Sequence, residues 1–93
     1  MIKSFKHKGL KKFFEYGDVS GIQTAHAKKI YKILSAIDGA ETINFLKSMQ
    51  GFNLHPLKGD KKSLWSITVN GNWRITFEFI DKNAYILDYQ DYH

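Results

Sequence analysis

The feature that most constrains the fold is the second half of the chain, where apolar and polar residues alternate in three segments. These segments are LWSITVN at 64–70, NWRITFEFI at 72–80 and AYILDYQDY at 84–92. A period of two residues, combined with many β-branched and aromatic side chains, predicts half-buried β-strands. Asn70-Gly71 and Asp81-Lys82-Asn83 separate them and are typical turn sequences. The pattern therefore predicts an antiparallel meander.

The length of the first turn decides which side chains face the core. A two-residue turn at Asn70-Gly71 would set Ile67 opposite Arg74 and leave the apolar residues of the two strands on opposite faces. Because a slip of one residue turns every side chain to the other face, burial favours a three-residue loop at 70–72. The expected pairs are Trp65 with Phe77, Ile67 with Ile75 and Val69 with Trp73. A three-residue loop at 81–83 then pairs Phe79 with Tyr85, Phe77 with Leu87 and Ile75 with Tyr89.

This register gives the sheet one apolar and one polar face. The apolar face, expected to lie against helices, carries Trp65, Ile67, Ile75, Phe77, Phe79 and Leu87. The other face carries Ser66, Thr68, Arg74, Thr76 and Glu78. We expect it to be a polar surface open to a ligand.

The first half of the chain has helical periodicity. Leu10, Phe13 and Phe14 predict one helix that ends near Gly17. A longer helix is expected after Gly21, with Gly39 at its C-cap. The apolar residues of this longer helix are Ala27, Ile30, Ile33, Leu34 and Ile37. A short helix is expected at 42–49. Helices followed by a meander with one covered face predict a single α+β domain over residues 1–93.

Composition excludes several classes of function. The chain has no cysteine, and its four histidines, at positions 7, 26, 55 and 93, show no i,i+3 or i,i+4 pair, so we expect no metal and no cofactor. The basic N-terminus is followed by no apolar run, which favours a cytoplasmic protein without a membrane segment. The net charge is +5, and Lys3, Lys6, Lys8, Lys11 and Lys12 all precede the first acidic residue. Such a cluster fits a polyanionic partner or a solvated surface about equally.

Two further motifs carry groups able to move protons. LHPLKGD holds His55, Lys58 and Asp60, and the chain closes on Asp91, Tyr92 and His93. Taken one at a time, these are typical turn, loop and tail residues. Arg74, the only arginine, adds a planar fork that suits phosphate. Together they match metal-free RNA cleavage, which needs an acid, a base and cations around one phosphate.

Three stretches carry a resemblance to a known family: IKSFKHKGLKKFFE, LHPLKGDKKSLWSITVNGNWRITFEF and the closing DYQDYH. They resemble, nearly end to end, the HigB-type toxins of the RelE/ParE superfamily. The resemblance implies a RelE-like fold and a toxin of a type II toxin–antitoxin system that cleaves mRNA in the ribosomal decoding site. It also implies a helix-turn-helix, HigA-like antitoxin, contact with the 70S ribosome, and operator DNA bound only through the antitoxin complex.

By position in these motifs, the resemblance places the active site on His55, Lys58, Arg74, Asp91, Tyr92 and His93. We expect a general base at His93 or Asp91, phosphate stabilisation by Lys58 and Arg74, leaving-group protonation through His55, and base stacking or phosphate orientation by Tyr92. A contact with RNA or ribosome is expected for Lys6, Lys8, Lys11, Lys12, Lys61 and Lys62. If the last side chain belongs to the site, a C-terminal tag weakens the toxin.

Two alternatives and one geometric difficulty stay open. The chain could be a non-catalytic, ParE-like inhibitor of DNA gyrase, or a basic module that only binds RNA or the ribosome. Strict alternation puts Tyr92 on the face of Arg74 but Asp91 and His93 on the opposite face. For all of them to reach one phosphate, the last residues must leave strand geometry.

Overall fold

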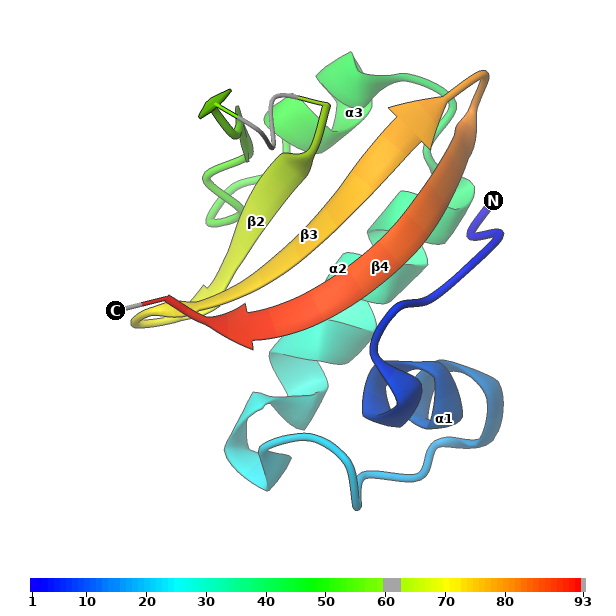
Figure 1. The fold of residues 1–93 in the computed structure, drawn as a ribbon, viewed down its shortest axis with the longest axis vertical. Coiled ribbons are helices and arrows are strands. Elements are labelled where there is room, and N and C mark those ends of the chain that lie inside the picture. Colours follow the sequence, from blue (N-terminus) through cyan, green and yellow to red (C-terminus); the bar gives the residue numbers. More distant parts are fainter. Residues whose placement is uncertain (60–62, 93) are drawn as a thin grey trace.

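The computed structural model describes residues 1–59 and 63–92 and has an α+β architecture (Figure 1). Its helices are α1 (Lys8–Tyr16), the 3-10 turn η1 (Thr24–His26), α2 (Ala27–Gly39) and α3 (Ile43–Lys47). Its strands are β1 (His55–Pro56), β2 (Trp65–Asn70), β3 (Trp73–Ile80) and β4 (Asn83–Asp91). They form one antiparallel sheet in the order β1-β2-β3-β4. The predicted fold class, with helices before a meander, is confirmed.

Side-chain and backbone caps fix both ends of α1. The Nδ1 atom of His7 accepts the Leu10 amide at 3.0 Å, and so satisfies one of the donors that a helix N-terminus leaves unpaired. Gly17 ends the helix in the left-handed conformation, with φ 73°, and its amide donates to Phe13. The predicted end near Gly17 is confirmed.

The expected C-cap of α2 is wrong by one residue. Gly39 is the last helical residue, and Ala40 is the cap, in an extended conformation that needs no glycine. Ala40 is 2 % exposed, so its methyl group helps to close the core where the chain leaves the helix. Thr42 then caps α3 by accepting the Phe45 amide, and α3 is shorter than the predicted 42–49.

Strands β2 and β3 pair in the register that burial favours. Trp65 lies opposite Phe77 and Ile67 opposite Ile75, as predicted, and both isoleucines are fully buried. The third predicted pair, Val69 with Trp73, is wrong: a β-bulge lies between Thr68 and Asn70, and Asn70 pairs with Trp73. The bulge takes up one residue, so the apolar register coexists with a tight turn at Gly71-Asn72.

A second bulge corrects the β3–β4 prediction in the same way. Ile75 pairs with Tyr89 as expected, but Phe79 pairs with Ala84 rather than Tyr85. The register shifts between Thr76 and Glu78, so the expected pairing of Phe77 with Leu87 falls inside the bulge, although both side chains are fully buried. The turn is the two-residue Asp81-Lys82, with φ 49° and 70°, and Ile86 on β4 also has a positive φ of 51°.

The N-terminal segment covers the outer edge of the first half of β4. Ile2 and Phe5 form parallel bridges to Ala84 and Leu87. The Met1 ammonium donates to the Lys82 carbonyl at 3.0 Å. The edge of β4 is therefore paired from the turn as far as Leu87, because the segment then enters α1.

The close approach of the backbone at Gly9 to that at Gly21 allows a test of this packing. A Cβ atom at Gly9, near the start of α1, would clash with the Gly21 carbonyl oxygen. Gly9→Ala should therefore lower the free energy of unfolding by about 2 kcal/mol, although alanine is the better helix former. Gly39→Ala is the control, because a Cβ there meets nothing within 4 Å, and it should stabilise the chain by up to about 1 kcal/mol. Equal effects of the two changes in urea unfolding would contradict the close approach.

Candidate active site

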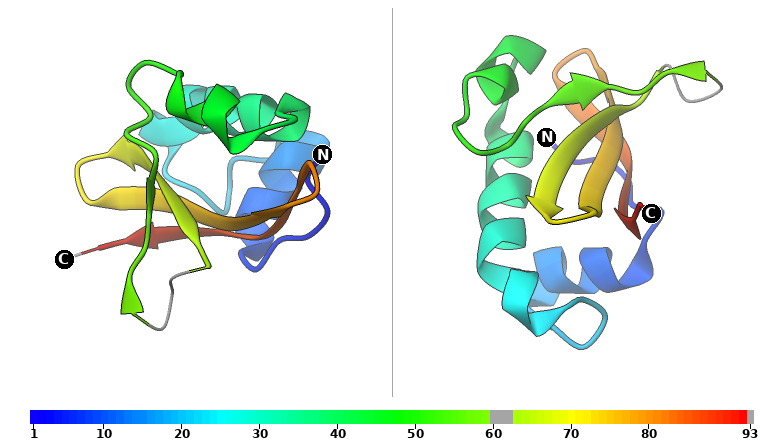
Figure 2. Two further views of the ribbon diagram at one scale, coloured as in Figure 1. Left: turned by 90° about the horizontal axis from the view of Figure 1, so that it is seen from above. Right: turned by 90° about the vertical axis from the view of Figure 1, so that its left-hand side faces the viewer.

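The candidate site lies on the face of the sheet turned away from α2, here called the open face (Figure 2). Register places two rows of side chains on it: His55, Ser66, Thr76 and Asp88 in one, and Thr68, Arg74 and Gln90 in the next. The expected open polar surface is wrong at its centre, because Ser66 is 0 % and Thr76 1 % exposed. Both are short side chains on the central strands, with neighbours on either side. Only the residues that flank Ser66 and Thr76 on this face can therefore contact a ligand.

Arg74 is half-buried on β3 and is held to the turn that precedes it. Its Nη1 atom donates to the Gly71 carbonyl at 2.7 Å and to the Trp73 carbonyl at 3.2 Å. Within the described part of the chain, Nη2 and Nε donate to no acceptor. The guanidinium is thus fixed on one side, while its other donors remain available to an anion.

His55 stands on the edge strand β1 with its ring orientation fixed. Its Nδ1 atom lies 2.9 Å from the Asn53 carbonyl oxygen. Because a carbonyl can only accept, Nδ1 carries the proton, and Nε2 is the end that can take or give a proton in solvent. Asn53 has φ 50°, a conformation that asparagine tolerates better than most residues.

Lys58 is exposed and is the second residue of the connection between β1 and β2. The connection is closed at its base because the Leu57 amide donates to the Leu64 carbonyl at 2.9 Å. Lys61, Lys62 and His93 lie outside the described residues, so their expected roles stay predictions.

The structure separates Asp91 from Arg74. Asp91 pairs with Trp73, and so takes the helix-side face, where its charge helps to raise the pKa of Tyr89. Tyr92 follows the strand, and its amide donates to the Asn72 carbonyl at 2.8 Å. Figure 1 shows the end of β4 beside the β2–β3 turn. The alternation that the sequence predicts for Asp91 therefore holds up to this point.

Strand spacing gives the scale of the site. His55 and Arg74 are two strands and two residues apart, which is about 12 Å between Cα atoms for adjacent strands about 4.8 Å apart. Lys58 lies further along, in the direction away from Arg74. The structure therefore brings His55 and Arg74 to one face, with Lys58 beyond His55, whereas Asp91 lies on the helix side of the sheet.

The lysines predicted to bind RNA lie on two surfaces. Lys8, Lys11 and Lys12 are exposed on α1. Lys6 precedes α1, and its Nζ atom lies 4.0 Å from an oxygen of Asp88, which is on the open face. The Lys6 side chain is exposed and the contact is long, so the pair contributes little to stability and Lys6 remains able to turn to another anion.

Sequence reasoning missed a buried group beneath the end of β4. The His26 Nδ1 atom and the Tyr89 hydroxyl are 2.7 Å apart, and the ring of Trp73 stacks on that of Tyr89 at 4.6 Å. A usable signal was present, because His26 stands four residues before Ile30 and seven before Ile33 and so continues the apolar stripe of α2. The predicted burial of Tyr89 opposite Ile75 is confirmed.

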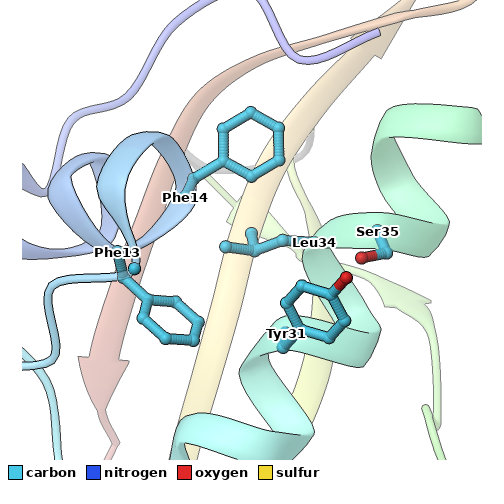
Figure 3. A pocket seen from close by; sticks show the side chains of 6 residues that line it. Phe13, Phe14, Tyr31, Leu34 and Ser35 are labelled. Carbon is cyan, nitrogen blue, oxygen red and sulfur yellow. The ribbon is translucent and has the colours of Figure 1, made fainter.

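A pocket of about 300 Å³ lies between α1 and α2, away from the open face (Figure 3). It is lined by Phe13, Phe14, Gly17, Tyr31, Leu34 and Ser35. Tyr31 is 68 % exposed and Phe14 37 %. The lining holds no carboxylate, imidazole or ammonium, so this pocket is no candidate for acid–base chemistry.

Two further features of residues 1–59 and 63–92 concern metal ions and membranes. No group of three or more His, Asp or Glu side chains there could hold a metal ion. No helix in the same residues combines the length and hydropathy needed to cross a membrane.

The pKa of Tyr89 provides a test of the buried group. Burial raises the pKa of this phenol above its ordinary value of 10.0, and the carboxylate of Asp91 raises it further. Above about pH 10 the unfolded chain loses a proton that the folded chain keeps, so stability should fall as the pH rises. Tyr89→Phe should remove this part of the alkaline loss in urea unfolding measured on both sides of that pH. An unchanged slope would show that Tyr89 titrates like an exposed phenol.

Two comparisons identify the family, and a third shows the fold. The model of the RelE-like toxin of the type II toxin–antitoxin system HigB matches residues 3–93. The chain is 57 % identical to the Endoribonuclease HigB of Proteus vulgaris over 93 residues, which cover 100 % of both proteins. The YoeB–YefM complex from Staphylococcus aureus contains a chain with the same fold, with a TM-score of 0.65, 21 % identity and coverage of 100 % of this chain and 95 % of that one. The chain belongs to the HigB-like family of RelE-like toxins of type II toxin–antitoxin systems.

Proposed function

We propose that this toxin is a ribosome-dependent endoribonuclease that cleaves mRNA in the decoding site without a metal ion. The observation that carries the proposal is the open face, where Arg74 offers unused guanidinium donors and His55 offers Nε2. Membership of the HigB-like family and the identity to an endoribonuclease support it.

The reaction would be attack of a ribose 2′-hydroxyl on the adjacent phosphorus. A base takes the hydroxyl proton while the bond from phosphorus to the 5′-oxygen breaks, and an acid protonates that oxygen. Negative charge increases on the phosphoryl oxygens in the transition state. Cations that are already held beside these oxygens need no reorganisation during the reaction. We therefore expect them to make the largest contribution to transition-state stabilisation.

Each candidate residue has a role in this scheme. Arg74 binds the phosphoryl oxygens, with Lys58 as the second cation, and Tyr92 stacks on a base or orients the phosphate. His55, protonated on both nitrogens, gives its Nε2 proton to the leaving oxygen while Nδ1 stays bonded to Asn53. The base is His93 or Asp91. Asp91 would have to reach the 2′-hydroxyl around the end of β4, because it shares its face with Tyr89.

The partners follow from the same assignment. As a type II toxin, the chain requires a cognate antitoxin, which we propose to be a HigA-like helix-turn-helix protein that also carries the complex to operator DNA. The substrate is mRNA on the 70S ribosome. The ribosome would position the mRNA in a site that spreads its own groups over more than one strand.

Variants at the open face test the nuclease. Arg74→Ala and His55→Ala should each lower codon-phased mRNA cleavage about 100-fold or more, because each removes transition-state or proton-transfer stabilisation. Lys32→Ala, on the exposed face of α2, is the control and should cleave like the unmodified chain. The measurement is a map of mRNA 5′ ends after induction in growing cells, together with cleavage on purified ribosomes.

The same experiment separates the alternatives. Growth arrest with DNA damage and no cuts would support a ParE-like gyrase inhibitor. Arrest that survives both active-site changes, without cuts, would support a module that only binds RNA or the ribosome. Either result contradicts the proposed reaction.

The lysines of α1 have a different expected signature. Lys11→Ala combined with Lys12→Ala should raise KM for ribosomes about tenfold at low salt and leave kcat nearly unchanged, because such contacts bind polyanions without reaching the reacting atoms. Lys28→Ala with Lys32→Ala makes the same change in net charge on α2 and should have a smaller effect. Equal effects of the two pairs would mean that only net charge matters.

A further inference from the structure

A cluster of aromatic and imidazole side chains lies on the helix side of the last residues of β4. The Tyr89 hydroxyl is 2.7 Å from His26 Nδ1, and the Gln23 amide donates to it at 3.4 Å. Trp73 stacks on Tyr89 with an interplanar angle of 28°, and its ring also meets the edge of His26 at 5.7 Å. One phenol therefore connects β4, β3 and the start of α2.

The polar pair is not required for filling the core. Tyr89 is 5 % and His26 7 % exposed, so both polar groups are almost wholly removed from water. A phenylalanine and a leucine would occupy similar volume without the cost of desolvating a hydroxyl and an imidazole. Unlike such apolar packing, a hydrogen bond is directional, and so it fixes the position of one atom relative to another.

The last residues of β4 have a neighbouring strand on one side only in the described structure. The N-terminal segment pairs with the outer edge of β4 only as far as Leu87, which accepts the amides of Lys6 and His7. Beyond Leu87 the described structure pairs β4 on one edge, with β3. Tyr89 lies in this singly paired stretch, directly before Gln90, which is opposite Arg74.

We propose that His26 is a positioning residue. Its hydrogen bond to Tyr89 holds the end of β4 against the start of α2, and so sets where Asp91 and Tyr92 stand relative to Arg74. The inference rests on the proposed nuclease function, because it assigns His26 a role in presenting those residues to mRNA. The Gln23 amide already donates to the Tyr89 oxygen, so in the proposed arrangement the phenol hydrogen points to Nδ1 and His26 is the acceptor.

Three single changes separate the hydrogen bond from packing. Tyr89→Phe removes the hydroxyl, and His26→Leu removes the acceptor while it retains an apolar side chain. His26→Asn places an amide oxygen where Nδ1 stands and should restore the bond. Single-turnover cleavage on purified ribosomes, well below each variant's Tm, should show kcat lowered about ten- to 100-fold by the first two changes, with KM nearly unchanged.

The pattern across variants decides the role. His26→Asn should recover most of the lost rate, and Tyr89→Phe combined with His26→Leu should be no slower than the worse single variant, because both remove one bond. Rates equal to the unmodified chain for Tyr89→Phe and His26→Leu would overturn the proposal. Failure of His26→Asn to recover the rate would overturn it as well.

A second measurement keeps this test apart from the proposed function. The backbone amide NMR signals of Gln90, Asp91 and Tyr92 in the toxin without ribosomes should shift in Tyr89→Phe and His26→Leu and stay near their original positions in His26→Asn. If the unmodified chain does not cleave mRNA, the nuclease assignment fails, while these signals still report whether His26 positions the strand. Unchanged signals in all three variants would overturn the positioning role, whatever the activity.

Discussion

Burial of one face of the β2–β3–β4 meander is the constraint on which the rest of the structure depends. Ile67, Ile75 and Tyr89 form a row across the three strands on the helix side. Full burial of each isoleucine contributes about 2 kcal/mol. A slip of one residue would exchange this row for that of Arg74, and would place a guanidinium among apolar side chains at a cost of several kcal/mol. The register that forms the core is thus the one that presents Arg74 on the open face.

The sequence was sufficient to predict this register because alternation and burial agree. It was insufficient for the two bulges, since each results from a compromise between a tight turn and the apolar pairing beyond it. Ile86 shows why: a β-branched residue at positive φ is disfavoured locally, and the Ile86 amide is held by the Ser4 hydroxyl at 2.8 Å, from 82 positions away in the chain. Such long-range contacts leave no mark in local patterns.

The candidate site was predictable to a similar extent. Arg74 and His55 could be placed on one face from alternation and motif position, and the structure puts them there. The burial of Ser66 and Thr76 was not foreseeable. Alternation predicts which face of the sheet a side chain is on, but not whether longer neighbouring side chains cover it. The Ser66 hydroxyl is buried without a hydrogen-bond partner among the described residues. The middle of the open face is therefore polar but inaccessible to solvent.

The arrangement of the site follows from where a small sheet has room for function. Central strands β2 and β3 are committed to the core on one side and closed by short residues on the other. Groups that must meet a substrate then have to come from the two-residue edge strand β1, from the start of β3, where Arg74 follows the turn, and from the end of β4. These are the least supported parts of the sheet, and each is tied down individually: His55 by the Asn53 carbonyl, Arg74 by the Gly71 carbonyl, and β4 through Tyr89 by His26. In a sheet this small, single hydrogen bonds to side chains thus take over the support that neighbouring strands give elsewhere.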